Sequence, residues 1–205
     1  MGRKYSILLG GVPGVGKSSI SGYIARNLDI DIVLSGDYLR EFSRGLLSKP
    51  DVDSIGVSVY DSWKLFGEKN RENIIRGFAR QSEILAPGIT RVLERSQKNG
   101  EYLILETLYF SPELVPKEIL DQCIVLYIYI SNEEIHRNRL LERGKFTHAN
   151  SPGERLTSHL PEYRTVMDRC VETSRKMGIK VFDNMDYGRT RDEIMKYVEE
   201  QVGTD

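Results

Sequence analysis

Cysteine, excess charge and long apolar runs are all scarce in this chain of 205 residues. Its two cysteines, Cys123 and Cys170, lie far apart and cannot form the framework of a disulfide-rich secreted domain, so we expect a reducing, cytoplasmic setting. The 29 basic and 30 acidic residues give a net charge of −1, so we expect neither nucleic acid nor an anionic membrane as a partner. The apolar run within residues 4–10 is too short for a signal-peptide core or a membrane span.

Hydrophobic residues make up 40% of the chain, which is enough for a sizeable core, and we expect residues 1–205 to form a single domain. Short apolar runs alternate with segments of helical periodicity, a pattern typical of the α/β class. We therefore predict a five-stranded parallel sheet with helices on both faces and right-handed crossovers. The predicted strands cover residues 4–10, 31–35, 101–106, 123–131 and 179–183.

The segments between these strands are predicted to be helical over most of their length. Pro87-Gly88 is expected to kink or split the longest helix, and residues 46–57 are predicted to be a loop. Tyr60, Trp63 and Phe66 are interpreted as core residues rather than as a platform for a substrate. The predicted helices cover residues 17–28, 37–45, 58–99, 132–143, 161–177 and 188–202.

The stretch "GVPGVGKSS" has the full Gly-x-x-x-x-Gly-Lys-Ser pattern of a phosphate-binding loop. It lies between a predicted strand and a predicted helix, so backbone N–H groups and the helix N-terminus would face phosphate oxygens. Lys17 is long enough to reach the β- and γ-phosphates, and Ser18 offers a hydroxyl to Mg²⁺. The pattern therefore predicts a nucleotide site formed by Gly11, Val12, Pro13, Gly14, Val15, Gly16, Lys17, Ser18 and Ser19.

Two acidic residues follow predicted strands and are expected near this loop, because ligands of open parallel sheets bind at the carboxyl ends of the strands. Glu106 ends the third strand, where it would either hold Mg²⁺, directly or through a water, or cap the strand. Asp37 follows the second strand. It would either position and deprotonate an attacking hydroxyl or cap the following helix.

Arginine is frequent after the fourth predicted strand. The polar segment 144–160 has the composition of a lid, which would bring cations to the transferred phosphoryl group and keep water out. Arg143 borders this segment and Arg155 lies within it, so both are predicted catalytic cations. Arg40 and Arg44 lie four positions apart on one helix face, where they would either bind an anionic acceptor or form a solvated surface.

Several stretches resemble the archaeal 2-phosphoglycerate kinase-like family of P-loop kinases. They are "GGVPGVGKSSISGYIARNL", "SGDYLREFSRG", "SVYDSWKL" and the segment 74–116, and the resemblance runs over roughly residues 5–185. It implies a nucleoside monophosphate kinase-like fold, ATP and Mg²⁺ as the donor pair, and a small phosphorylated carboxylate as acceptor. It also implies phosphate and metal ligands at Lys17 and Ser18, active-site acids at Asp37 and Glu106, acceptor contacts at Arg40, Arg80 and Gln81, and a position beside the nucleotide base for Asn184.

The chain departs from this family's pattern in ways that bear on the acceptor. It starts at the first strand, whereas the methanogen-type enzymes carry an extra N-terminal regulatory domain. Val12-Pro13 stands where Thr-Ser is more frequent, and "SGD" stands where "TD" is usual. These departures favour the branch whose short members are similar to mevalonate 3-phosphate 5-kinases, with 2-phosphoglycerate as the alternative acceptor.

Two further functions remain open from the residues alone. A nucleoside monophosphate kinase would share the loop and the lid but would need no general base, because its acceptor is already an anion. A nucleotide-binding regulator that hydrolyses ATP slowly would need neither an acceptor site nor a lid bearing arginines. The sequence leaves the base preference of the donor and the oligomeric state open, a homodimer included.

Overall fold

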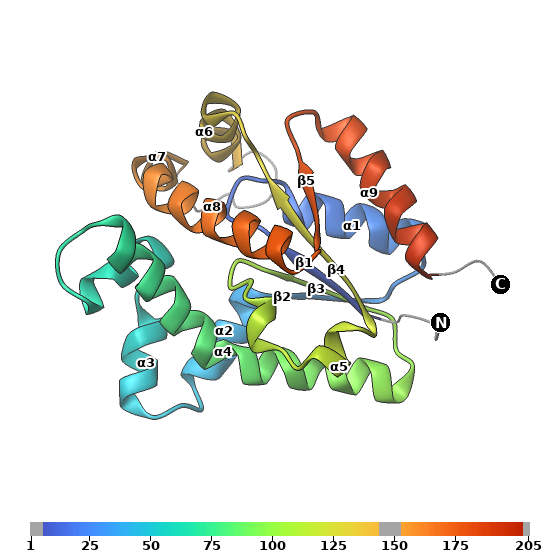
Figure 1. Ribbon diagram of the computed structural model, residues 1–205, viewed down its shortest axis with the longest axis horizontal. Helices are drawn as coiled ribbons and strands as arrows, with labels where there is room; N and C mark the ends of the chain where they lie inside the picture. Colours follow the sequence, from blue (N-terminus) through green and yellow to red (C-terminus); the bar gives the residue numbers. More distant parts are fainter. Residues whose placement is uncertain (1–5, 144–152, 203–205) are drawn as a thin grey trace.

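A computed structural model describes residues 6–143 and 153–202, which are built around a five-stranded sheet (Figure 1). The strand order is β2-β3-β1-β4-β5 and every neighbouring pair is parallel, so the predicted sheet is confirmed. The central strand pairs with β3 on one side and β4 on the other. The strands are β1 (Ser6–Gly10), β2 (Ile32–Ser35), β3 (Leu103–Thr107), β4 (Cys123–Tyr129) and β5 (Lys180–Asp183).

Helices cover both faces of the sheet (Figure 1). The first and last long helices, α1 and α9, pack on one face, and α4 and α8 pack on the other. Two short 3₁₀ segments, η1 (Val59–Leu65) and η2 (Pro112–Leu114), connect the larger elements. The α-helices are α1 (Lys17–Asn27), α2 (Gly36–Arg44), α3 (Lys49–Gly56), α4 (Arg71–Asn99), α5 (Lys117–Leu120), α6 (Glu133–Glu142), α7 (Gly153–Ser158), α8 (Leu160–Lys176) and α9 (Tyr187–Val202).

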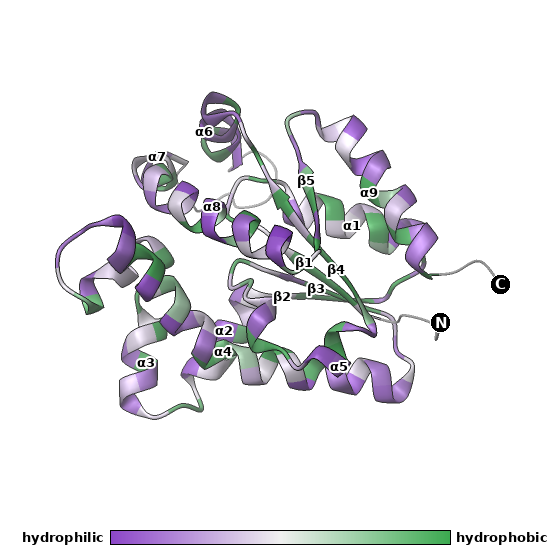
Figure 2. Ribbon diagram, viewed as in Figure 1, coloured by the Kyte–Doolittle hydropathy of each residue, from purple (hydrophilic) through white to green (hydrophobic). Residues whose placement is uncertain are grey.

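The core lies between the sheet and these two helix layers. Every residue of β1 and β3 is buried, as expected of a parallel sheet covered on both faces, where apolar residues need not alternate with polar ones. Figure 2 shows hydrophobic colour along the central strands and hydrophilic colour on the outer sides of the helices. Within the part of the chain that the structure describes, no helix is long and apolar enough to cross a membrane.

The loop predicted for residues 46–57 is wrong, because Lys49–Gly56 forms α3. Its proline lies in the first helical turn, where a missing N–H costs no hydrogen bond. Its last carbonyl groups accept hydrogen bonds from Arg40 and Gln81, which belong to other helices. The helix is therefore stabilised by donors that are distant in sequence, which a local pattern does not reveal.

The split expected at Pro87-Gly88 does not occur, and α4 runs without interruption from Arg71 to Asn99. Pro87 and Gly88 lie on the exposed side of the helix. Leu85, Ile89 and Leu93 are buried on the other side, and their packing offsets the hydrogen bond that proline removes.

The predicted lid, 144–160, falls only partly within the described residues, because residues 144–152 lie outside them. Its remaining part forms α7, and the lid boundary at 160 coincides with the first residue of α8. A short helix bearing Arg155 therefore stands directly before the long helix α8.

Candidate active site

The phosphate-binding loop connects β1 to α1, as the pattern predicts. Gly14 and Gly16 have φ values of 85° and 95°, a region of backbone conformation that other residues rarely adopt. A Cβ atom on Gly16 would lie 2.7 Å from the amide nitrogen of Asn184. Both glycines are therefore needed for the shape of the loop and for its close contact with the chain beneath it.

Two buried side chains hold the loop through its carbonyl groups. Asn184 Nδ2 donates to Val15 O at 2.8 Å, and the ring nitrogen Nε2 of His136 lies 2.8 Å from Pro13 O. Because a carbonyl only accepts, this nitrogen carries the proton. Asn184 is fully buried, so its amide supports the loop instead of standing at the edge of a nucleotide base as expected.

His136 was not singled out from the sequence, because a single histidine on a helix carries no signal of a contact with a loop far away in the chain. Burial lowers its pKa to about 4, and the nearby cations Arg164 and Arg139 act in the same direction. The imidazole is therefore neutral near pH 7 and acts as a fixed donor to the loop.

Ser18 and Glu106 form the second part of the site. Ser18 Oγ lies 2.8 and 3.0 Å from the two carboxylate oxygens of Glu106, which is 8% exposed at the end of β3. A hydroxyl that donates its proton to a carboxylate keeps its lone pairs available for a cation. The pair thus fits a nucleotide-bound Mg²⁺, which takes oxygen ligands and completes its shell with phosphate and water.

Lys17 lies beside these groups and is half-buried, with Nζ donating to Val12 O at 3.3 Å. Burial lowers the pKa of Lys17, and the carboxylates of Glu106 and Asp37 oppose this effect. Among the described residues, no three His, Cys, Asp or Glu side chains group as a metal site.

Asp37 is exposed in the first turn of α2 and does not cap this helix. Ser35 is the N-cap, and its hydroxyl accepts from the backbone N–H of Asp37 at 3.3 Å. Within the described residues, the Asp37 carboxylate makes no hydrogen bond or ion pair. Gly36 allows α2 to approach β3 this closely, because a Cβ there would overlap the side chain of Thr107.

Arg143 is partly buried at the end of α6, next to the loop. Burial lowers its pKa, whereas the carboxylates of Asp37 and Glu106 raise it, and the nearby Arg155 lowers it. Arg143 therefore lies near both acids and near Arg155, the other predicted lid cation. A cavity of about 450 Å³ lies beside them, lined by Pro13, Gly14, Gly16, Lys17, Ser18, Ser19, Arg139, Glu142, Arg143 and Tyr187.

Three residues that line the cavity, Arg139, Glu142 and Tyr187, are not among the predicted site residues, although Arg139 belongs to the arginine-rich segment after the fourth strand. Arg139 donates to Met185 O at 3.0 Å, and the Tyr187 hydroxyl lies 3.5 Å from Ser19 O. The turn after β5 positions both side chains, because it accepts the hydrogen bond of Arg139 and leads directly to Tyr187. This turn comes from a part of the chain far from the phosphate-binding loop.

The residues expected to bind the acceptor lie at the junction of α2, α3 and α4, and their polar groups contact the protein itself. Arg40 donates to Ile55 O at 2.7 Å and to Val57 O at 3.1 Å. Gln81 is fully buried and donates to Ser54 O and Val57 O. In this structure both side chains hold α3 in place. The sequence did not predict this role, because residues 46–57 were predicted to be a loop.

The other two candidates form ion pairs. Arg80 Nη2 lies 2.6 Å from Asp51 Oδ1, which attaches α4 to α3. Arg44 Nη1 lies 2.7 Å from Glu41 Oε2 on the outer side of α2. The solvated-surface alternative for Arg44 therefore fits its position better than a contact with an acceptor.

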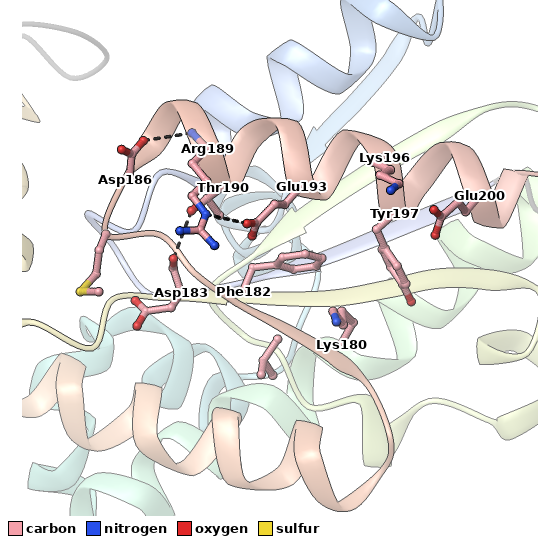
Figure 3. Close-up of a pocket in the computed structure, with 12 residues that line it drawn as sticks. Lys180, Phe182, Asp183, Asp186, Arg189, Thr190, Glu193, Lys196, Tyr197 and Glu200 are labelled. Atoms are coloured by element: carbon pink, nitrogen blue, oxygen red, sulfur yellow. Dashed lines mark hydrogen bonds and ion pairs between the residues drawn. The ribbon is translucent and has the colours of Figure 1, made fainter.

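A different hollow of about 600 Å³ lies between β5 and α9 (Figure 3). Two of its charged side chains, Arg189 and Glu193, form an ion pair with 2.8 Å between Nε and Oε1. It contains none of the predicted site residues, and Tyr197 packs edge-on against Phe182 at its far end. The convergence of acids, lysine and arginines at the loop makes the loop the better candidate for chemistry.

Comparison with known proteins agrees with this assignment. The family model described as an AAA domain matches residues 10–152. The mevalonate-3-phosphate 5-kinase of Thermoplasma acidophilum is 48% identical over 197 residues, which cover 94% of this chain and 96% of that protein. The 2-phosphoglycerate kinase of Methanocaldococcus jannaschii is 32% identical over 98% of this chain, but the match covers only 65% of that protein.

The match to the 2-phosphoglycerate kinase of Methanopyrus kandleri likewise covers 61% of that protein, so this chain spans less than two thirds of the length of both enzymes. Among solved structures, a protein from Thermus thermophilus matches with a TM-score of 0.57 and 17% identity over 99% of this chain and 100% of its own. At this identity the likeness supports the fold alone.

Proposed function

Because this chain belongs to the 2-phosphoglycerate kinase-like family of P-loop kinases, we propose that it transfers the γ-phosphoryl group of ATP to the 5-hydroxyl of mevalonate 3-phosphate. Membership makes it an ATP-dependent kinase that phosphorylates an alcohol group. The finer assignment is supported by 48% identity to a mevalonate-3-phosphate 5-kinase over nearly the whole length of both chains. 2-Phosphoglycerate is the alternative acceptor, supported by matches at 32% identity or less.

The observation that carries this proposal is the exposed Asp37 carboxylate, which is unpaired within the described residues and is an electrostatic neighbour of Lys17 and Arg143. A carboxylate in this position can orient a hydroxyl and accept its proton as the hydroxyl oxygen attacks phosphorus. A nucleoside monophosphate has no proton to remove from its attacking oxygen. The free acid therefore favours an alcohol as the acceptor.

The other residues would bind and stabilise the transferred group. Lys17 would contact the β- and γ-phosphate oxygens, while Arg143 and Arg155 would stabilise the charge that spreads over the phosphoryl oxygens. Ser18 and Glu106 would hold Mg²⁺, which would supply positive charge to the phosphates. Catalysis then consists mainly of positioning and electrostatic stabilisation.

We propose that the residues form one kinase domain in which α7 belongs to a lid. The lid carries Arg155 and joins α6, whose end carries Arg143, to α8. Its closure over the nucleotide would bring the two arginines to the phosphates and exclude water, which would otherwise compete with the acceptor.

Asp37→Asn tests the proposed proton acceptor. The amide keeps the size of the side chain but cannot accept the proton, so kcat with mevalonate 3-phosphate should fall by about 10²- to 10⁴-fold. The KM for ATP should change little. Asp31→Asn is the control, since Asp31 is also exposed but precedes β2 at the opposite end of the strand. Turnover of Asp37→Asn close to that of the wild type, with the fold intact, would remove this role.

A further inference from the structure

Three tyrosines near the proposed site are nearly buried, yet their hydroxyls have no partner within the described residues. Tyr60 in η1 is 8% exposed, while Tyr109 after β3 and Tyr163 in α8 are each 3% exposed. None of the three hydroxyls makes a hydrogen bond within the part of the chain that the structure describes. Unlike the hydroxyls of Tyr102 and Tyr127, they are not among the fully enclosed polar atoms. Each hydroxyl is therefore accessible to solvent, although most of its ring is buried.

A hydroxyl that solvent reaches donates to water in the free protein, so it carries no penalty for lacking a partner in the chain. The same hydroxyl can donate to a ligand that displaces this water. Three such donors on nearly buried rings in one region indicate a place where a ligand supplies the acceptors.

Tyr109 and Tyr163 lie near the charged groups of the proposed site. Tyr163 and Tyr60 pack edge-to-face, with ring centroids 5.7 Å apart at 80°. Tyr163 is an electrostatic neighbour of Arg143, Tyr109 and Asp37, and Tyr109 is a neighbour of Asp37 and Arg40. Burial raises the pKa of both Tyr109 and Tyr163, so both phenols stay protonated at neutral pH. A neutral donor binds an anion without adding charge repulsion.

A cluster of His159, Glu162 and Lys69 holds the ring of Tyr60. His159 stacks on Tyr60 with centroids 3.9 Å apart at 11°, and its Nδ1 lies 3.6 Å from Glu162 Oε1. The Glu162 side chain is only 1% exposed and forms an ion pair with Lys69. The cluster joins η1 and the segment before α4 to the start of α8. It also covers one face of the Tyr60 ring, so a nucleotide base cannot stack on that face.

We infer that the hydroxyls of Tyr109 and Tyr163 donate hydrogen bonds to the anionic groups of the acceptor and thereby determine specificity for a small molecule that carries carboxylate or phosphate. This inference rests on the proposed function, because it assigns the acceptor side of the same site. It also supplies contacts that Arg40 and Gln81 do not offer, since those side chains hold α3. Arg143 adds the positive charge that the phenols lack.

The test removes the hydroxyl of each tyrosine and keeps its aromatic ring. Tyr109→Phe and Tyr163→Phe should raise the KM for the acceptor by roughly 10- to 100-fold, as expected for the loss of a hydrogen bond to a charged group. The KM for ATP should stay within about twofold. Tyr197→Phe is the matched control, because Tyr197 is another tyrosine with an aromatic contact and lies in the hollow beside α9 (Figure 3). Thermal denaturation checks that each variant folds.

Each variant is measured with mevalonate 3-phosphate, 2-phosphoglycerate and nucleoside monophosphates, using whichever of these the wild type phosphorylates. An unchanged acceptor KM in both variants would overturn the inference and leave the proposed function standing. A raised KM for 2-phosphoglycerate, in an enzyme that does not use mevalonate 3-phosphate, would support the tyrosine site and overturn the proposed acceptor. If the KM for ATP rose as much as the KM for the acceptor, the inference would be contradicted. The hydroxyls would then affect the binding of both substrates and would not be specific to the acceptor.

Discussion

At the scale of single residues, the loop owes its position to side chains that lie far away in the sequence. Pro13 and Val15 are ordinary loop residues, but their carbonyls accept hydrogen bonds from His136 and Asn184. The loop pattern itself was predicted correctly because its glycines, lysine and serine lie within nine consecutive residues. The two donors were not predicted in these roles, because only the fold brings α6 and the turn after β5 to the loop.

His136 makes the stability of the protein depend on pH. Its pKa is about 4 in the folded protein, against an ordinary value of 6.5 that applies to the unfolded chain. Between these values the unfolded chain binds more protons, so stability rises with pH through this window and is lost as pH falls from 6.5 towards 4. The loss from this group should be about 3 kcal/mol.

Urea unfolding between pH 4 and 7 measures this effect. His136→Gln is the informative variant, because glutamine keeps a side-chain N–H but does not titrate in this range. Its free energy of unfolding should depend less steeply on pH than that of the wild type. Parallel pH profiles for the two proteins would show that the imidazole is not held neutral by the fold.

At the scale of elements, the sequence predicted best where the signal is local. The five strands were found from short apolar runs, and α6 from its first-turn acids. The helix α3 was missed because Arg40 and Gln81, which cap its last carbonyls, come from α2 and α4. Tyr60 was correctly interpreted as buried, but its neighbours Tyr163 and His159 come from α8 and the residue before it, so their grouping could not be read from the chain.

The contact between η1 and α4 depends on Gly77. A Cβ at this position would overlap both the side chain and the backbone of Ser62. Gly77→Ala should therefore push η1, which carries Tyr60, away from α4 and destabilise the protein by about 1–3 kcal/mol. We also expect a raised KM for the acceptor, since Tyr60 packs against Tyr163.

Gly88→Ala is the matched control in the same helix, because a Cβ atom on Gly88 would meet no heavy atom within 4 Å. That substitution should stabilise the protein by about 0.5–1 kcal/mol through better helix propensity. Chemical denaturation and acceptor kinetics would distinguish the two variants. Equal effects of both alanines on stability would contradict the close approach of η1 to α4.

At the scale of the whole molecule, the parallel sheet explains why the chemical groups gather in one place. All five strands run in one direction, so the residues that follow β1, β2 and β3 meet at one edge. Lys17 and Asp37 follow β1 and β2, and Glu106 is the last residue but one of β3. Arg143 follows α6 and Arg155 lies in α7, while Tyr109 follows β3 and Tyr163 lies in α8.

The central claim is that this arrangement transfers phosphate to a small phosphorylated alcohol. The most direct measurement offers the purified protein an equimolar mixture of mevalonate 3-phosphate, 2-phosphoglycerate and four nucleoside monophosphates with limiting Mg·ATP. Mass spectrometry then identifies the phosphorylated product, and phosphorus NMR locates the new phosphate. The account predicts that mevalonate 3,5-bisphosphate is the main product. Exclusive phosphorylation of 2-phosphoglycerate or of a nucleotide, or release of inorganic phosphate alone, would contradict it.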